Sequence, residues 1–201
     1  MRYVRVGIMQ NHHQKLLSLL ESLVRLDASD KEMVIQYFEP VQYKAGELLV
    51  KPGGIAHYMY FINEGYLRTY SLADATEITH HINCPMGFIT AYSSYTTRQP
   101  SVEYLHCITD CELLRIASEQ LTALFQQNAA WAEAGRIINE RVVTYNEKRS
   151  RDLVGKTAEQ RYRDVIESHP DYLQNVPLQY IASFIGVKPE SLSRIRRGIM
   201  K

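Results

Sequence analysis

The chain has 201 residues, which is enough for one large domain or for two small domains that share an interface. Hydrophobic residues make up 45% and charged residues 22%, a composition that argues against an intrinsically disordered chain. The apolar segment from Leu16 to Val24 is interrupted by Glu21 and is too short to span a bilayer, and no secretory signal pattern is recognisable. Three irregularly spaced cysteines do not make a disulfide framework, so we expect a cytoplasmic protein without membrane contact.

The formal net charge of +1 conceals an uneven distribution along the chain. Residues 148–201 contain eleven lysines and arginines against six acidic residues, whereas residues 1–147 contain twelve against sixteen. A basic C-terminal end on an acidic body indicates binding to a polyanion. A solvated basic surface without a ligand is the alternative that charge alone leaves open.

The first part of the chain begins with helical periodicity and then changes to short strands. A helix is predicted from Gln10 to Leu26, because apolar residues recur there every three or four positions. Ser29 and Glu32 have the spacing of a capping box, so a second helix is expected to begin at Ser29. Beyond Val41 the predicted strands, separated by turn residues, are Glu47–Lys51, Tyr58–Ile62, Tyr66–Tyr70, Glu77–Ile82, Val102–Ile108 and Glu112–Ile116. Six short strands at this spacing predict a small antiparallel barrel or sandwich.

Helical periodicity returns after Ser118. A long helix is predicted from Asn128 to Arg151, and its narrow apolar face is typical of a helix that packs against a copy of itself. The residues that we assign to this dimer contact are Ala130, Ala134, Ile137, Ile138 and Tyr145. Packing of the same face on the chain's own barrel is the alternative. Thr157 and Gln160 form another capping box, which opens a helix that ends at His169-Pro170.

The segment from Leu178 to Arg197 has the pattern of a helix-turn-helix. Ala182 supplies the small residue where the two helices cross, and Gly186 tolerates the left-handed backbone of the turn. Pro189 suits the first turn of the second helix, where its missing N–H is not needed. An ordinary pair of antiparallel helices is the alternative.

The second helix of this motif presents polar residues opposite its apolar side. A helix that enters the major groove of double-stranded DNA contacts base edges with its N-terminal residues. We therefore assign base contacts to Glu190, Ser191 and Arg194, because Arg can bind guanine and Glu can accept a hydrogen bond from cytosine. The residues assigned to phosphate contacts are Lys188, Arg196 and Arg197.

At this point the whole chain resembles the Crp/Fnr family of bacterial transcription regulators. Besides the helix-turn-helix, the resemblance is carried by Lys44–Gly53, Tyr60–Arg68 and Asp110–Ile116. It implies an α+β fold with an N-terminal antiparallel β-barrel, the jelly roll of cyclic-nucleotide-binding-like domains, flanked by helices. A long dimerisation helix and a C-terminal helix-turn-helix domain follow. The implied division is an effector or sensor domain at 1–127, a dimerisation helix at 128–151 and a DNA-binding domain at 152–201.

The stretch that holds the cyclic nucleotide in this family departs here from the family's pattern. Members that bind cyclic nucleotides carry a Gly-Glu pair for the ribose and an Arg for the cyclic phosphate. Ala91-Tyr92 and Ser101 stand at these positions, so cyclic AMP is not expected to bind in the usual mode. The tyrosines either fill the cavity themselves or line a pocket for a flatter ligand, and Arg98 is either a displaced anion contact or a surface residue. The candidate effector pocket consists of Tyr92, Tyr95, Arg98, Ser101 and Tyr104.

Catalytic and metal chemistry find little support in the sequence. His80 and His81 are adjacent on a predicted strand and would point to opposite faces, so they cannot bind one ion together with Cys84. No His-x-His pair, nucleophile motif or Gly-rich phosphate loop is recognisable. We therefore expect no catalytic residue, no metal and no cofactor. The short link Asp171–Val176 also leaves little room for the β-hairpin wing that family members often insert before the motif.

These observations together predict a homodimeric transcription regulator that binds a two-fold-related operator. Its expected partners are double-stranded DNA and a second copy of the chain. RNA polymerase is a further candidate partner, and the small-molecule effector is unknown or absent. A non-enzymatic sensor whose C-terminal module binds another protein is the first alternative, and a metal-dependent cupin-like enzyme is the second.

Overall fold

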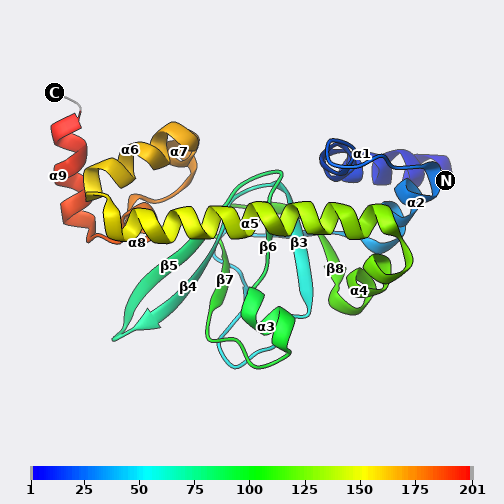
Figure 1. Ribbon diagram of the computed structural model, residues 1–201, viewed down its shortest axis with the longest axis horizontal. Coiled ribbons are helices and arrows are strands. Elements are labelled where there is room, and N and C mark those ends of the chain that lie inside the picture. The colour runs from blue at the N-terminus through cyan, green and yellow to red at the C-terminus, as the bar shows by residue number, and fades with distance from the viewer. Residues whose placement is uncertain (1, 200–201) are drawn as a thin grey trace.

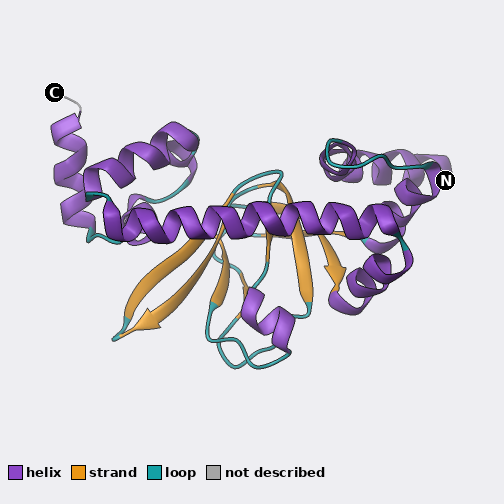
Figure 2. Ribbon diagram, in the orientation of Figure 1, coloured by secondary structure: helices purple, strands orange, loops and turns teal. Residues whose placement is uncertain are grey.

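The computed structural model describes residues 2–199 as an elongated molecule organised around one long helix, α5, which runs along its longest axis (Figure 1). Two β-sheets lie on one side of α5, α1, α2 and α4 lie at one end, and α6–α9 lie at the other (Figure 2). Within the described residues no helix is both long and apolar enough to cross a membrane. The helices are α1 Arg2–Glu21, α2 Ala28–Tyr37, α3 Tyr92–Thr97, α4 Ser118–Gln127, α5 Ala129–Gly155, α6 Ala158–Ser168, α7 Tyr172–Asn175, α8 Leu178–Phe184 and α9 Pro189–Ile199.

The strands form two four-stranded antiparallel sheets, with the orders β1-β8-β3-β6 and β2-β7-β4-β5. The strands are β1 Glu39–Tyr43, β2 Leu48–Val50, β3 Tyr58–Glu64, β4 Leu67–Ala73, β5 Thr76–Asn83, β6 Phe88–Ile89, β7 Tyr104–Cys107 and β8 Cys111–Ala117. The predicted α+β class with an antiparallel jelly roll is confirmed. Over residues 2–199, however, the sheets face each other as open layers and do not close into a barrel.

The main core fills the space between the two sheets. Alternating residues of β3, β4, β7 and β8 point inward, as the two-residue period of a strand requires. The side chains of Tyr60, Ile62, Leu67, Leu105 and Leu113 are 4% exposed or less. These strands were predicted from their runs of Tyr, Ile and Leu. Two further strands, β1 and β6, were not predicted, because Pro40 interrupts the strand pattern of β1 and β6 is very short. In the structure β1 pairs with β8 and β6 pairs with β3, and this pairing stabilises both strands.

The first two helices differ from their predicted bounds. The helix predicted at 10–26 starts eight residues earlier and ends at Glu21, where the last turn tightens and the amides of Leu23 and Val24 both bond to Leu20 O. The second helix is capped by Asp27 instead of Ser29. Asp27 Oδ1 accepts from the amide of Asp30, and Asp30 Oδ2 accepts from the amide of Asp27, so the capping box exists two residues earlier than predicted.

The long helix α5 begins where the sequence predicts and runs four residues further. Asn128 caps it by accepting from the amides of Ala130 and Trp131. The first turns pack on α4 so closely that a Cβ at Gly135 would lie 2.7 Å from the Phe125 ring. Trp131 is 3% exposed and belongs to the core that α1, α2 and α4 share with the first sheet. This half of α5 is therefore anchored to its own domain.

The C-terminal module contains the predicted helices in the predicted order. The capping box of Thr157 and Gln160 opens α6, which ends at Ser168, directly before the predicted stop at His169-Pro170. One short helix, α7, occupies the link between α6 and α8, so residues 171–176 hold no β-hairpin. The module packs around a small core that it shares with Ile82 of β5, and in this core Tyr162, Tyr172, Ile181 and Leu192 are 3% exposed or less.

Candidate nucleic-acid interface

The turn between α8 and α9 has the geometry that a helix-turn-helix requires. Gly186 has a φ of +73°, the left-handed region that glycine enters without steric cost. Ala182 is fully buried at the crossing, and its carbonyl accepts from the amide of Val187 at 2.9 Å. Pro189 occupies the first position of α9, where no backbone donor is lost. The two predicted key residues, Ala182 and Gly186, therefore stand where the motif needs them.

Two arginines from other helices hold the end of α8. Arg149 of α5 donates to Phe184 O at 2.8 Å and lies 3.7 Å from the centre of the Phe184 ring. Arg161 of α6 donates to Ile185 O at 2.8 Å. Cations at a helix C-terminus satisfy its last carbonyl groups and oppose its dipole. Sequence reasoning counted both residues only as part of the basic charge and missed this role.

The N-terminal half of α9 exposes the predicted base-contacting residues. Glu190 and Arg194 are exposed, and Ser191 between them is half-buried. Leu192 on the opposite side is 1% exposed and packs into the module core. Arg194 Nη2 is 3.4 Å from Ser191 Oγ, so the guanidinium lies over the serine and leaves donors for a ligand. The structure thus brings these three residues to one outward face of α9, at the end of the molecule (Figure 1).

The predicted phosphate-contacting residues flank this face. Lys188 and Arg197 are exposed and Arg196 is half-buried. Among the ion pairs of residues 12–199, whose side chains the structure describes, none involves these three or Arg194. Other cations of the module are already paired, with Lys156 bound to Asp164 and Arg163 to Glu159. The positive charge that remains available is therefore concentrated on α9 and the turn before it.

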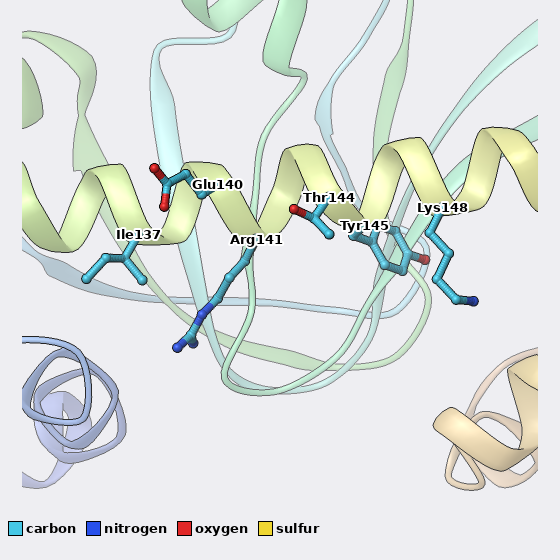
Figure 3. Close-up of a pocket in the computed structure, with 6 residues that line it drawn as sticks. All are labelled: Ile137, Glu140, Arg141, Thr144, Tyr145 and Lys148. Atoms are coloured by element: carbon cyan, nitrogen blue, oxygen red, sulfur yellow. The ribbon is translucent and has the colours of Figure 1, made fainter.

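The outer face of α5 forms a shallow groove of about 450 Å³. Figure 3 shows Ile137, Arg141 and Lys148 projecting from the same side of the helix. The groove is lined by Ile137, Glu140, Arg141, Thr144, Tyr145 and Lys148. Ile137 and Tyr145 were predicted for a dimer contact and lie here, with Tyr145 43% exposed.

Other residues predicted for the dimer contact lie elsewhere on the helix. Ala134 is 1% exposed in the core with Leu124 and Trp131, so it is covered by its own domain and is not available to a partner. Ala130 and Ile138 are half-buried outside the groove lining. The sequence could not distinguish the two sides of α5, because apolar residues occur on both. Those on one side pack on the domain core, and those on the other side are exposed.

The predicted effector residues lie on and around α3, where most of them are held by neighbouring groups. Tyr92 is 55% exposed, whereas Tyr95 is 8% exposed and belongs to the core between the sheets. Arg98 has a φ of +61°, forms an ion pair with Glu119 at 3.5 Å and lies 5.3 Å from the Tyr95 ring centre.

The remaining two effector candidates follow α3 in the chain. Ser101 is 5% exposed and donates to Glu103 O at 2.8 Å, while its oxygen accepts from the Glu103 amide. Tyr104 stacks on Tyr70 with ring centres 4.6 Å apart. Tyr95 and Tyr104 therefore fill the region around α3 with their own side chains. The Ser101 hydroxyl is already hydrogen-bonded to Glu103, so it is not directed at an anion.

The histidines of β5 have separate surroundings. His80 Nε2 lies 2.8 Å from Ser71 Oγ, and burial together with Arg149 lowers the pKa of His81 to about 4. Within the described residues, no group of three or more His, Cys, Asp or Glu side chains is placed to hold a metal ion.

The C-terminal module contacts the free edge of the second sheet. Ser183 Oγ of α8 accepts from the amide of Thr79 and donates to Glu77 O, both at 2.8 Å. Tyr172 donates to Ile82 O at 2.8 Å, further along the same strand, β5. These contacts join elements about a hundred residues apart in the chain, and no sequence pattern predicts them.

Comparison with known proteins identifies the fold. Residues 40–128 match the family model of the cyclic nucleotide-binding domain. FixK2 from Bradyrhizobium japonicum has a TM-score of 0.70 at 15% identity, over 81% of this chain and 84% of that chain. The regulator CLP of Xanthomonas campestris, described as responsive to c-di-GMP, has a TM-score of 0.65 at 18% identity, over 87% and 92%. A Crp/Fnr-family regulator from Eubacterium rectale has a TM-score of 0.66 at 18% identity, over 87% and 84%.

Among curated proteins, no sequence matches this chain significantly. The likeness to the solved structures covers both the sheets and the C-terminal helices, since it extends over most of the chain. The resemblance found in the sequence is thus matched by the structure, and the chain contains a cyclic nucleotide-binding domain within the fold of the Crp/Fnr transcription regulators.

Proposed function

We propose that the protein is a cytoplasmic transcription regulator that binds double-stranded DNA as a homodimer through α9. The observation that carries the proposal is the exposed face of Glu190, Ser191 and Arg194, bordered by cations without an acidic partner among residues 12–199. Such a face offers base-edge donors and acceptors together with phosphate contacts, which is what sequence-specific binding requires. We divide the chain functionally into a sensor domain at 1–127, a dimerisation helix at 128–151 and a DNA-binding domain at 152–201, and the last turn of α5, which ends at Gly155, belongs to the DNA-binding domain.

The outer groove of α5 supports the dimer. Five large apolar side chains of α5 are at least 40% exposed, namely Val142, Val143, Tyr145, Leu153 and Val154. A second α5 seated on the groove would cover Ile137 and Tyr145. One helix-turn-helix makes few base contacts, so two copies related by a two-fold axis supply the specificity that an operator needs.

The sensor domain is proposed not to bind cyclic AMP in the family's usual mode. Tyr95 fills part of the core between the sheets, and the Ser101 hydroxyl is held by Glu103. Arg98 is engaged with Glu119 and Tyr95 instead of facing an empty anion site. No catalytic role is proposed, because the solved structures that share the fold include proteins described as regulators.

The decisive experiment compares two arginines of α9. After an operator is selected from random duplexes with the purified protein, binding is measured for Arg194→Ala and Arg197→Ala. We expect Arg194→Ala to cost about 1–3 kcal/mol at the operator and to relax the preference at one base pair. Arg197→Ala should weaken binding to all duplexes alike and reduce the salt slope by about 1.

Arg163→Ala is the matched control, since Arg163 lies in the same module but is paired with Glu159. It should bind as the native protein does. Equal losses on every duplex for Arg194→Ala would contradict the base-contact assignment. The absence of any salt-sensitive binding of the native protein to duplex DNA would favour a protein-binding module instead.

A further inference from the structure

Arg68 of β4 is a buried cation whose surroundings come from both halves of the molecule. Its side chain is 1% exposed, which is rare for arginine and costly unless the charge is paired. Nη2 donates to Glu77 Oε2 at 2.6 Å and Nη1 donates to Thr79 Oγ1 at 3.2 Å, both on β5. Nε donates to His106 Nδ1 on β7 at 3.1 Å. The second sheet, which we call the sensor sheet, therefore accepts a hydrogen bond from each of the three guanidinium nitrogens.

The aromatic surroundings of Arg68 come partly from the C-terminal module. The guanidinium carbon lies 4.1 Å from the ring centre of Tyr70, on the same strand, and 3.5 Å from the ring centre of Tyr180, on α8. The Tyr180 ring also meets His106 edge-on, with centres 6.0 Å apart. Burial, and then Arg68 itself, lowers the pKa of His106, so its Nδ1 stays available as an acceptor at neutral pH. A cation covered by an aromatic ring in a site shielded from water is strongly attracted to it.

A second set of contacts acts beside this one. Ser183, one turn after Tyr180, bonds to both Glu77 O and the Thr79 amide, the backbone groups that β5 leaves free at the sheet edge. Tyr66 donates to Asp171 at 2.7 Å, and burial with that carboxylate raises the pKa of Tyr66 to about 12, which keeps its hydroxyl a donor. The same short stretch of β5 thus binds Arg68 through side chains and α8 through backbone groups.

We propose that Arg68 and Tyr180 form a clamp that fixes the C-terminal module on the sensor sheet, in the position for binding DNA, without a bound small molecule. The docked position leaves Glu190 and Arg194 exposed, so docking orients α9 without covering its DNA-binding face. The inference rests on the proposed function. A module that leaves this position part of the time binds its operator more weakly, in proportion to the time lost. Because a dimer needs both modules in place, the loss is multiplied.

The test uses full-length protein, dialysed and without added effector, in two independent measurements. The first is hydrogen exchange at the β5 edge, where the Thr79 amide reports docking without any DNA. The second is affinity for the selected operator. The variants are Tyr180→Ala and Arg68→Lys. Arg68→Lys keeps the positive charge but removes the planar guanidinium group. Tyr180→Phe keeps the ring and is the conservative variant, and Ser168→Ala, an exposed serine of the same module, is the control.

We expect Tyr180→Ala and Arg68→Lys to exchange the Thr79 amide at least tenfold faster and to bind the operator at least tenfold more weakly. Tyr180→Phe and Ser168→Ala should behave as the native protein in both measurements. Native-like exchange in Tyr180→Ala would overturn the clamp. Faster exchange with unchanged or tighter DNA binding would overturn the positioning role of the clamp. Docking of the module would then have no effect on DNA binding or would inhibit it. A native protein that binds no duplex at all would refute the proposed function, while the exchange measurement would still decide whether Tyr180 holds the module.

Discussion

His81 gives the structure a pH dependence that can be calculated. The residue lies on β5, paired across the ladder with Thr69, and it is partly buried. Burial lowers its pKa from 6.5 to about 4, and the nearby charges of Arg149 and His80 act in the same direction. The folded state therefore binds fewer protons than the unfolded state between these two values. Its stability rises with pH across this window, is complete above pH 6.5 and is lost as the pH falls toward 4.

The magnitude follows from the two pKa values. Lowering a histidine pKa from 6.5 to about 4 makes the folded state about 3 kcal/mol less stable once both states are protonated. At pH 5 the same linkage gives a loss of about 2 kcal/mol relative to neutral pH. His81→Gln keeps the size of the side chain and removes the titration. The variant should therefore lose about 2 kcal/mol less than the native protein between pH 7.5 and pH 5.

The assay is urea unfolding at these two pH values, at one fixed protein concentration because a dimer unfolds in a concentration-dependent way. Carboxylates and other histidines titrate in both proteins, so only the difference between native and variant reports His81. His57→Gln, at an exposed position, is the control and should follow the native protein. Identical pH dependence in native protein and His81→Gln would refute the reasoning.

Two predictions concern the dimer and the effector. Ile137→Glu places a carboxylate in the groove of α5 and should shift the protein to monomer in sedimentation, whereas Ala132→Glu, at an exposed position of the same helix outside the groove lining, should not. A native protein that sediments as a monomer at micromolar concentration, even with DNA bound, would contradict the dimer. Calorimetry with cyclic AMP should give no saturable heat at physiological concentrations, because Ser101 offers no cation to the phosphate, and micromolar binding would contradict this.

The C-terminal module could be predicted from the sequence in detail because its determinants are local. A left-handed residue at Gly186, a small residue at Ala182 and a proline at position 189 each act within one or two turns of the backbone. The capping box of Thr157 is equally local and appears as predicted. The capping box predicted at Ser29 forms instead at Asp27 and Asp30, because Asp caps a helix as well as Ser does.

The effector region could not be predicted, because its structure depends on tertiary contacts. The sequence of α3 is rich in Ser, Thr and Tyr and has weak helix propensity. Ser94 holds α3 in place by accepting from the Ala56 amide and donating to Gln99 O. Which tyrosine is buried and which is exposed follows from this docking, so Tyr92 and Tyr95 were indistinguishable in the sequence although the structure separates them.

The basic end of the chain shows most clearly what a charge count can and cannot say. Net charge predicted a polyanion-binding end, yet several of those cations bind groups within the protein itself. Arg149 and Arg161 hold carbonyl groups at the end of α8, and Arg163 is paired with Glu159. The charge left for DNA depends on where the acidic and carbonyl partners lie, and only the fold determines that. An arginine in the acidic N-terminal part, Arg68, in turn contributes to the proposed positioning of the module without touching a ligand. Charge is therefore informative about a partner only after the internal acceptors have been assigned.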